Sequence, residues 1–169
     1  MKVLIQNRQK TAKINQQKIK RDSSALLRLL GLAGTELSIL LVNDKKMRQL
    51  NFTYRGIDKT TDVLSFPQFS WEAGKRGSAD AKDFQTSELP NFQASALVLG
   101  DVVINLQAAK RQAPEHGLSF MEEIRWLLVH GILHLIGYDH EKSKYAGRKM
   151  REKEKELLKY MGSTGKDKS

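Results

Sequence analysis

Three of the four histidines in this 169-residue chain are close together, at a spacing typical of metal-binding side chains. His130 and His134 are four residues apart, so on a helix they share one face on successive turns. His140 follows Gly137, and a glycine after the last helical turn lets the chain reverse in the left-handed conformation. We therefore expect His130, His134 and His140 to converge and hold one metal ion.

Three histidine ligands favour a catalytic metal site over a structural one, because they leave the fourth tetrahedral position open for water. We expect one zinc ion per chain, although histidine ligation also suits other divalent transition metals such as nickel, cobalt and copper. A bound metal lowers the pKa of its water to about 7 and so supplies hydroxide for hydrolysis. Asp139 can accept a hydrogen bond from the outer nitrogen of one of the ligand histidines and so orient that ring. His116, in a Pro/Gly break, is expected to be an ordinary surface residue.

The spacing also matches the protease pattern H-E-x-x-H-x-x-G-x-x-H in its histidines and its glycine. Gly131 stands where those proteases have the glutamate that acts as general base, which counts against peptide hydrolysis. A zincin-like metalloprotease without that glutamate stays an alternative. The net charge of +10 and the pI of about 9.8 favour a polyanionic substrate, although excess lysine also serves solubility.

A second alternative is a basic protein that binds RNA or the ribosome and whose metal is structural. Structural zinc has four protein ligands, and the sequence offers no evident fourth. The chain has no cysteine, which excludes disulfides and thiolate ligands and fits a reducing cytoplasm. It shows neither a signal peptide nor an apolar run of about 20 residues, so we expect a cytoplasmic protein without membrane contact.

The helix that carries His130 and His134 has clear sequence signals at both ends. Ser119 and Glu122 form a predicted capping box at its start, and Gly137 ends it. Between these points the segment is apolar almost all round, which is typical of a buried helix. The sequence therefore predicts that the two histidines project from a helix inside the domain.

The remaining pattern predicts one α+β catalytic domain over residues 1–169, in which a small sheet packs against helices. Expected strands cover residues 3–5, 36–42, 62–66 and 96–104, and expected helices cover 23–30, 43–54, 105–113 and 119–136, with a further helix around 148–159. Gly100 is expected at a bulge or close approach. A long flexible loop is expected at about 68–95 and a disordered basic tail at about 162–169.

Charged segments are interpreted in two ways. The alternating charges of residues 148–159 are typical of a solvated helix face. The lysines and arginine between Lys10 and Arg21 are candidates for a surface that faces RNA.

Several motifs resemble one known family. The segment His130–His140, HGILHLIGYDH, resembles at every defining position the YbeY signature H-G-x-L-H-L-x-G-Y-D-H. Further matches are Tyr54-Arg55-Gly56 with the segment 60–67, TTDVLSFP, and the segment 99–104, LGDVVI. A weaker match includes Met150, Glu154, Leu157 and Leu158 near the C-terminus. The resemblance extends from about Leu37 to Leu158.

This resemblance implies a zincin-like fold and a single-strand-specific, metal-dependent endoribonuclease. It also implies action in 3′-end maturation of 16S rRNA and in ribosome quality control, with single-stranded RNA, ribosomal RNA and the small ribosomal subunit as partners and no DNA. The family places an arginine near the metal, which corresponds to Arg55, where it can clamp a phosphate. The catalytic residues implied are thus Arg55, His130, His134 and His140, while Asp62 and Asp101 match motifs but can be purely structural.

Overall fold

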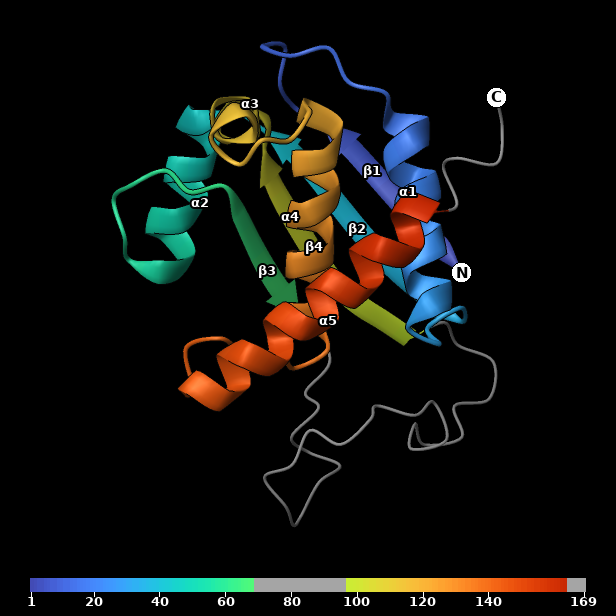
Figure 1. Cartoon of the computed structure of the whole chain (residues 1–169). Coiled ribbons are helices and arrows are strands. Elements are labelled where there is room, and N and C mark those ends of the chain that lie inside the picture. Colours follow the sequence, from blue (N-terminus) through green and yellow to red (C-terminus); the bar gives the residue numbers. More distant parts are fainter. Residues whose placement is uncertain (69–96, 164–169) are drawn as a thin grey trace.

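The computed structural model describes residues 1–68 and 97–163 of the chain (Figure 1). The four strands within these residues are β1 (Lys2–Asn7), β2 (Thr35–Val42), β3 (Val63–Pro67) and β4 (Leu97–Asn105). The five helices are α1 (Gln16–Leu29), α2 (Asp44–Arg55), α3 (Leu106–Glu115), α4 (Phe120–Leu135) and α5 (Lys144–Ser163). The predicted α+β class is therefore confirmed.

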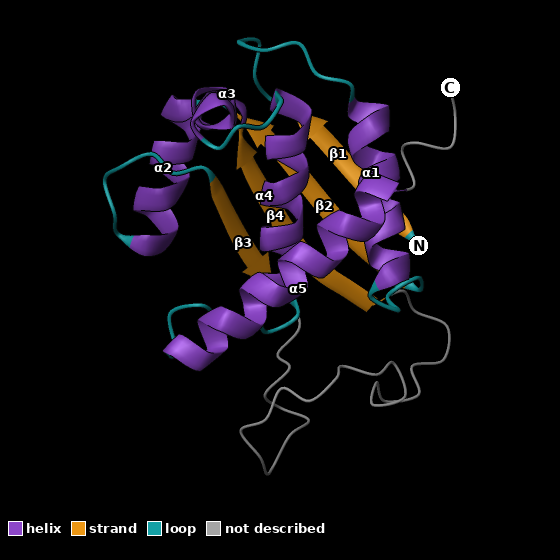
Figure 2. Ribbon diagram, viewed as in Figure 1, coloured by secondary structure: helices purple, strands orange, loops and turns teal. Residues whose placement is uncertain are grey.

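The strands form one mixed sheet in the order β1-β2-β4-β3. β2 pairs in parallel with both β1 and β4, while β3 runs antiparallel to β4 at the sheet edge. Helices α1, α4 and α5 lie across one face of this sheet (Figure 2). The predicted loop at 68–95 falls almost wholly outside the described residues, since only Gln68 is placed, and its backbone N–H still donates to Leu99.

Alternate residues of the central strand β4 enter two separate cores. Val102 and Ile104 are buried with the apolar residues of α4, whereas Val103 is buried in a smaller cluster with Met47 of α2. This division follows from the two-residue period of a strand, which sends neighbouring side chains to opposite faces. Each such buried side chain contributes roughly 1.5–3 kcal/mol. The sheet is thus covered on both faces, and α4 lies over the centre of one of them.

Gly100 has the close approach that the sequence predicts. Its φ of 140° is a conformation that other residues rarely adopt, and a Cβ built on it would lie 2.2 Å from the carbonyl oxygen of Phe66. The register between β2 and β4 also shifts beside it, between Glu36 and Leu37. A side chain at position 100 would therefore push β3 away from β4.

Helices α1 and α3 each differ from the prediction at one end. α1 begins at Gln16 and not at Ser23, because Asn15 caps it by accepting a hydrogen bond from the Lys18 N–H, and its polar first turns carry little apolar periodicity. α3 continues to Glu115, although the sequence predicts a break at Pro114. Pro114 is the last residue but one of α3, so the backbone hydrogen bond that it cannot donate lies at the very end of the helix.

The C-terminal part is helical for longer than predicted. α5 runs to Ser163, and the rest of the tail expected at about 162–169 lies outside the described residues. Within the placed residues, none of the helices combines the length and the hydropathy needed to cross a bilayer.

Candidate metal site

The predicted capping box at the start of α4 is confirmed. The Ser119 hydroxyl accepts from the Glu122 N–H, and the Glu122 carboxylate accepts from the Ser119 N–H at 2.8 Å. Most residues of the helix after its first turn are buried, including Leu127, Val129 and Leu133. Burial on several sides fixes the rotation of the helix, and this rotation leaves its two histidines only half-buried at one side.

The chain leaves α4 through a Schellman motif, which redirects it toward the histidines. Gly137 has a φ of 98°, its N–H donates to the His134 carbonyl at 3.1 Å, and the Tyr138 N–H donates to the Leu133 carbonyl at 3.0 Å. These are the two hydrogen bonds that define this motif. The predicted role of Gly137 is confirmed, and the reversal brings His140 back beside the helix.

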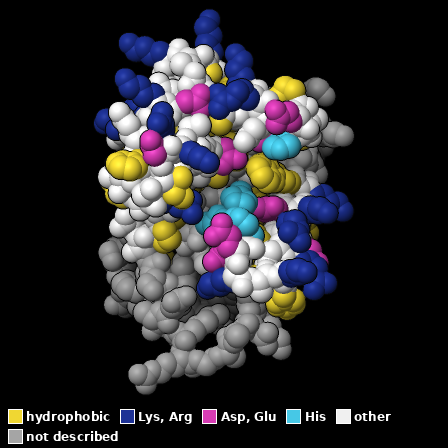
Figure 3. Space-filling model, turned by 90° about the vertical axis from the view of Figure 1, so that its left-hand side faces the viewer, with side chains coloured by type: hydrophobic (Ala, Val, Ile, Leu, Met, Phe, Trp, Pro, Cys, Tyr) yellow, Lys and Arg dark blue, Asp and Glu magenta, His cyan; other side chains and the backbone are white. Residues whose placement is uncertain are grey.

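The three histidines converge as the spacing predicts. Their candidate ligand atoms all lie within 4.8 Å of one another. The ring centroids of His130 and His134 are 4.7 Å apart, and that of His140 lies 5.3 and 5.1 Å from them. Histidine side chains gather near the middle of the face shown in Figure 3, with acidic side chains beside them.

The donor set fits a tetrahedral metal ion. The Nε2 atoms of His130 and His134 face each other at 3.1 Å. Two bonds of about 2.0–2.1 Å from zinc to nitrogen, at a tetrahedral angle, would separate the nitrogens by roughly 3.3 Å. His140 is exposed, so it can close the remaining distance by a side-chain rotation. Three neutral imidazoles at this spacing could hold one divalent ion and leave a further position open.

Glu154 of α5 orients His130 from outside the cluster. Its Oε1 lies 2.6 Å from His130 Nδ1, and its side chain is 8% exposed. A carboxylate that accepts from Nδ1–H directs the lone pair of Nε2 toward the cluster, as outer partners of metal-bound histidines commonly do. Sequence reasoning missed this role of Glu154, because 24 residues separate it from His130 and no local spacing links them.

Asp139 has a different role from the one expected. Its Oδ1 accepts from the Glu141 backbone N–H at 2.8 Å, so it stabilises the turn that carries His140. The expected hydrogen bond from Asp139 to the outer nitrogen of a ligand histidine is not among the contacts of the described residues. For His130 it is Glu154 that contacts this nitrogen.

The environment of His134 favours its neutral form. Burial lowers the pKa of His134 below its ordinary value, and the neighbouring His130 and His140 lower it further, while a backbone hydrogen bond with Tyr138 opposes them. A neutral imidazole keeps its lone pair free for a metal at neutral pH.

The structure explains why position 131 holds glycine. A Cβ on Gly131 would lie 2.8 Å from Val102 Cγ1 and 3.3 Å from Ser65 Oγ, which itself donates to the Gly131 carbonyl at 2.9 Å. This side of α4 packs against β3 and β4. A glutamate there would meet the sheet, so the general base of the protease pattern has no room at this position.

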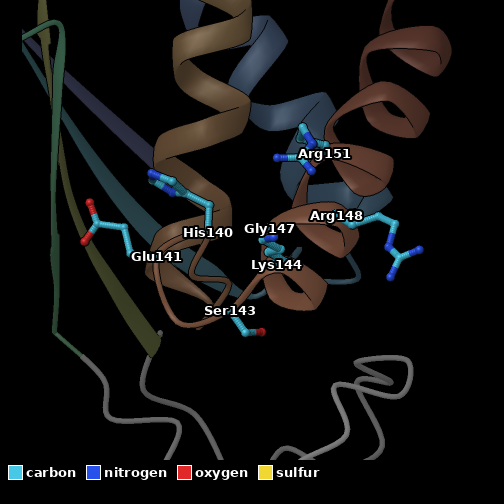
Figure 4. A pocket seen from close by; sticks show the side chains of 7 residues that line it. All are labelled: His140, Glu141, Ser143, Lys144, Gly147, Arg148 and Arg151. Atoms are coloured by element: carbon cyan, nitrogen blue, oxygen red, sulfur yellow. The ribbon is translucent and has the colours of Figure 1, made fainter.

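A basic pocket adjoins His140. The cavity of about 630 Å³ is lined by His140, Glu141, Ser143, Lys144, Gly147, Arg148 and Arg151. Figure 4 shows Arg148 and Arg151 projecting from α5, while His140 and Glu141 come from the segment that leads into it. Residues 148–159 are thus more than the solvated helix face expected, because their first turn contributes two arginines to the wall beside a candidate ligand.

Gly147 allows this close packing of α5. It is buried, and a Cβ on it would lie 3.2 Å from the carbonyl oxygen of His140 and 3.6 Å from Arg151 Nη1. A larger residue would therefore press on the backbone of His140. The approach of α5 to the histidine turn brings both its arginines and Glu154 to the site.

Arg55 lies at the C-terminal end of α2 and is exposed, with Gly56 capping the helix at a φ of 69°. Its neighbour Tyr54 packs on Phe66 of β3 with ring centroids 5.0 Å apart. β3 is the strand that contacts α4 through Ser65, so the end of α2 is fixed to the strand beside the histidines. Among described residues no ion pair holds the Arg55 guanidinium.

His116 is exposed, as the sequence predicts, but it also pairs with a buried carboxylate. Its Nδ1 lies 2.9 Å from Glu123 Oε2, and the Glu123 side chain is fully buried while that of His116 is 45% exposed. The hydrogen bond and the charge of Glu123 raise the pKa of His116 above 6.5. The sequence contained one signal for this pair, a glutamate in an otherwise apolar helix face, which predicts a buried partner.

The other sequence candidates have mainly structural contacts. The Asp62 carbonyl accepts from the Asn105 N–H at 2.8 Å, and the Asp101 carboxylate accepts from the Gln68 amide at 3.4 Å. The segment Lys10–Arg21 includes the first turns of α1, which Figure 1 places on the flank opposite α2 and β3. Its contact with RNA stays a prediction.

Comparison with known proteins gives the family. The family model of endoribonuclease YbeY matches residues 4–162. Relatives named endoribonuclease YbeY include one from Aquifex aeolicus, 41% identical over 88% of this chain and 85% of its own length, and one from Geobacter sulfurreducens, 36% identical over 98% and 99%. A relative from Arabidopsis thaliana, named endoribonuclease YBEY, chloroplastic, is 40% identical over 80% of this chain but only 20% of its own length.

A solution structure of a Thermotoga maritima protein shares the fold, with a TM-score of 0.60 over 96% of this chain and 90% of that one, at 22% identity. The predictions of a hydrolase of the nuclease class and of the YbeY resemblance are confirmed at the level of the family. From residue 4 to residue 162, the match covers both the sheet and the histidine cluster, and this chain belongs to the YbeY family of endoribonucleases.

Proposed function

We propose that this chain is a single-strand-specific, metal-dependent endoribonuclease with one zinc ion held by His130, His134 and His140. The observation that carries the proposal is the convergence of three imidazole nitrogens within 4.8 Å in a chain whose relatives are named endoribonucleases. Three histidines with an open position are typical of catalytic zinc. Zinc is the preferred ion, and nickel, cobalt and copper are its competitors.

The charges around the site support RNA over peptide as the substrate. Lys144, Arg148 and Arg151 line the pocket beside His140, where a polyanion gains from their field. The absence of a glutamate at Gly131, and of space for one, argues against the protease mechanism. A structural metal would need a fourth protein ligand, and the described residues supply a cluster of three.

The residues divide the chemistry among them. When bound, the metal supplies hydroxide at neutral pH and polarises a phosphoryl oxygen. The three histidines fix the position of that chemistry, and Glu154 holds His130 in the required tautomer. Arg55, exposed and without an ion-pair partner among the described residues, is free to form two parallel hydrogen bonds with a phosphate and stabilise the charge that develops on it.

The biological role that we propose is 3′-end maturation of 16S rRNA and quality control of ribosomes in the cytoplasm. The partners are then ribosomal RNA and the small ribosomal subunit, and the whole chain acts as one catalytic domain. The resemblance to the family supports this role, as does a net charge of +10, which suits an RNA-rich particle.

The test combines metal analysis with cleavage assays. Purified protein is expected to contain about one equivalent of metal and to cut single-stranded RNA, including a 3′-extended 16S precursor, but not duplex RNA or casein. Chelation should abolish cleavage, and added zinc should restore it. Cleavage of casein with RNA left intact would favour the protease alternative, and tight RNA binding without cleavage by metal-loaded protein would favour the binding-protein alternative.

A further inference from the structure

Glu123 is a buried carboxylate that lies outside the three-histidine cluster. Its side chain is fully buried in α4, and only one of its oxygens has a partner: Oε2 contacts His116, while Oε1 has none among the described residues. A buried carboxylate is costly unless a charge compensates it. The compensating group is His116, and the pair therefore fixes an imidazole at the surface.

His116 presents its other nitrogen outward. Nδ1 is engaged with Glu123, and the side chain is 45% exposed, so Nε2 is the nitrogen left for a ligand. Glu123, then the more distant Glu115 and Asp62, raise the pKa of His116, which favours the charged ring. A charged imidazole held this way is a directed N–H donor toward an anion.

Trp126 connects this imidazole to the histidine cluster. Its ring centroid lies 5.9 Å from that of His116 and 5.5 Å from that of His130. Glu123, Trp126 and His130 are spaced at three, then four residues on α4, so they share one side of the helix. Trp126 is only partly buried, and the face shown in Figure 3 presents hydrophobic side chains next to the histidines.

We propose that Trp126 and His116 form a subsite for the nucleotide next to the scissile phosphate: its unpaired base packs on Trp126 and its phosphate accepts a hydrogen bond from His116. Glu123 positions His116. The inference rests on the proposed function, since it states how the same site holds an RNA strand. Base stacking on an aromatic side chain requires a base freed from a duplex. The subsite therefore predicts a preference for single strands.

Replacing Trp126 tests the stacking. Trp126→Leu keeps apolar bulk but removes the ring, and it should raise KM for single-stranded RNA roughly tenfold with kcat within a few-fold, because the lost contact is made equally before and during reaction. Trp126→Phe keeps an aromatic face and should stay near the wild-type protein. Metal content is matched across variants. Equal KM values for Trp126→Leu and the wild-type protein would overturn the stacking role.

Replacing His116 tests the phosphate contact. His116→Gln keeps a donor for Glu123 but removes the charge, and it should raise KM a few-fold. It should also lower the salt slope, the slope of log K for RNA binding against log salt concentration, by about one, because one counterion fewer is released. Arg28→Gln, which removes an exposed charge from α1, is the matched control and should change neither. Identical salt slopes for His116→Gln and the wild-type protein would overturn this contact.

The sharpest test places an abasic nucleotide at each position around the cleavage site. In the wild-type protein one flanking position should be sensitive, and Trp126→Leu should be insensitive at that same position. If the abasic nucleotide and Trp126→Leu had additive effects on cleavage at every position, the inference would be overturned while the proposed function stayed intact.

A binding measurement separates the two proposals. In a Trp71→Phe background, Trp126 is the single tryptophan, and single-stranded RNA should quench its fluorescence. Quenching without cleavage by metal-loaded protein would refute the proposed function and leave Trp126 as an RNA-binding residue only. Cleavage without quenching would refute the subsite and support the function.

Discussion

Two pairs of histidine and glutamate lie toward opposite ends of α4, and they are chemically alike. His116 contacts Glu123 at 2.9 Å, and His130 contacts Glu154 at 2.6 Å. Their surroundings differ. The second nitrogen of His130 faces His134 at 3.1 Å, whereas the side chain of His116 is half-exposed; Trp126 lies beside both rings.

The comparison shows that a carboxylate partner does not by itself fix the chemistry of a histidine, because the other neighbours of the ring also act on it. Where three imidazoles converge, burial and the two neighbouring rings lower the pKa of His134, which favours a neutral ligand for a metal ion. Where one imidazole faces a buried carboxylate and water, the charged ring is favoured. The same pair thus orients a ligand at one end of α4 and holds a cation at the other.

The largest expected effect separates the two pairs by metal binding. Changing His130, His134 or His140 to Ala should sharply reduce metal occupancy at neutral pH, because each supplies one ligand of a site with three protein ligands. His116→Ala should keep a full equivalent. Affinity should fall as the pH drops, since protons compete with the metal for imidazole. Elemental analysis of dialysed protein measures this, and a full equivalent of metal in the triple-alanine variant would place the ion elsewhere.

The next effect concerns the RNA phosphate that the three-histidine cluster is expected to bind. Arg55→Ala should lower the single-turnover rate of RNA cleavage by about 10²–10³, because one preorganised donor to developing charge is lost. Arg55→Lys should restore only part, since an ammonium lacks the planar fork. Arg48→Ala on the same helix is the control. Rates for Arg55→Ala within a few-fold of the wild-type protein would remove Arg55 from the site.

Exchanging each glutamate for glutamine compares the two carboxylates directly. Glu154→Gln should weaken metal affinity about 10–100-fold, because the outer partner of His130 is lost. Glu123→Gln should leave it unchanged. Asp139→Asn should also have little effect, since Asp139 contacts backbone and not a ligand ring. Competition with a metallochromic chelator measures all three, and equal affinities for Glu154→Gln and Glu123→Gln would contradict the assignment.

A smaller effect tests the two arginines of α5 that line the pocket beside His140. Replacing Arg148 and Arg151 together by Gln should lower the salt slope of RNA binding by about two and weaken binding at low salt, if each contacts one phosphate. The control changes Lys155 and Lys159, which lie further along α5, in the same way. Slopes that are identical for both double variants would show that the pocket does not hold RNA.

The smallest effect is the titration of His116. Its pKa should lie above 6.5 by NMR and return toward 6.5 in Glu123→Gln. Because the folded state holds this proton more tightly, the pair stabilises the protein below pH 6.5, and the contribution is lost as pH rises through the raised pKa. Thermal unfolding of the wild-type protein and His116→Gln across this pH range should converge at high pH. A constant difference would contradict the mechanism.

The local geometry of the site follows from short-range features of the chain. The i,i+4 spacing of His130 and His134, the capping box at Ser119 and the glycine at 137 each act through backbone positions a few residues apart, so each could be predicted without the fold. The mixed α+β class followed in the same way from local periodicity. The ends of helices were harder to predict where a polar segment shows no periodic placement of apolar residues, as at the start of α1.

The surroundings of those residues depend instead on tertiary packing. Glu154 contacts His130, and Arg151 lines the pocket beside His140, because Gly147 lets α5 pack against the backbone of His140. No sequence spacing records these contacts. The exclusion of a side chain at Gly131 likewise depends on the distance between α4 and the sheet, since a Cβ at this position would lie 2.8 Å from Val102. Contacts between elements far apart in the chain depend on how whole faces pack, and a local pattern does not contain that information.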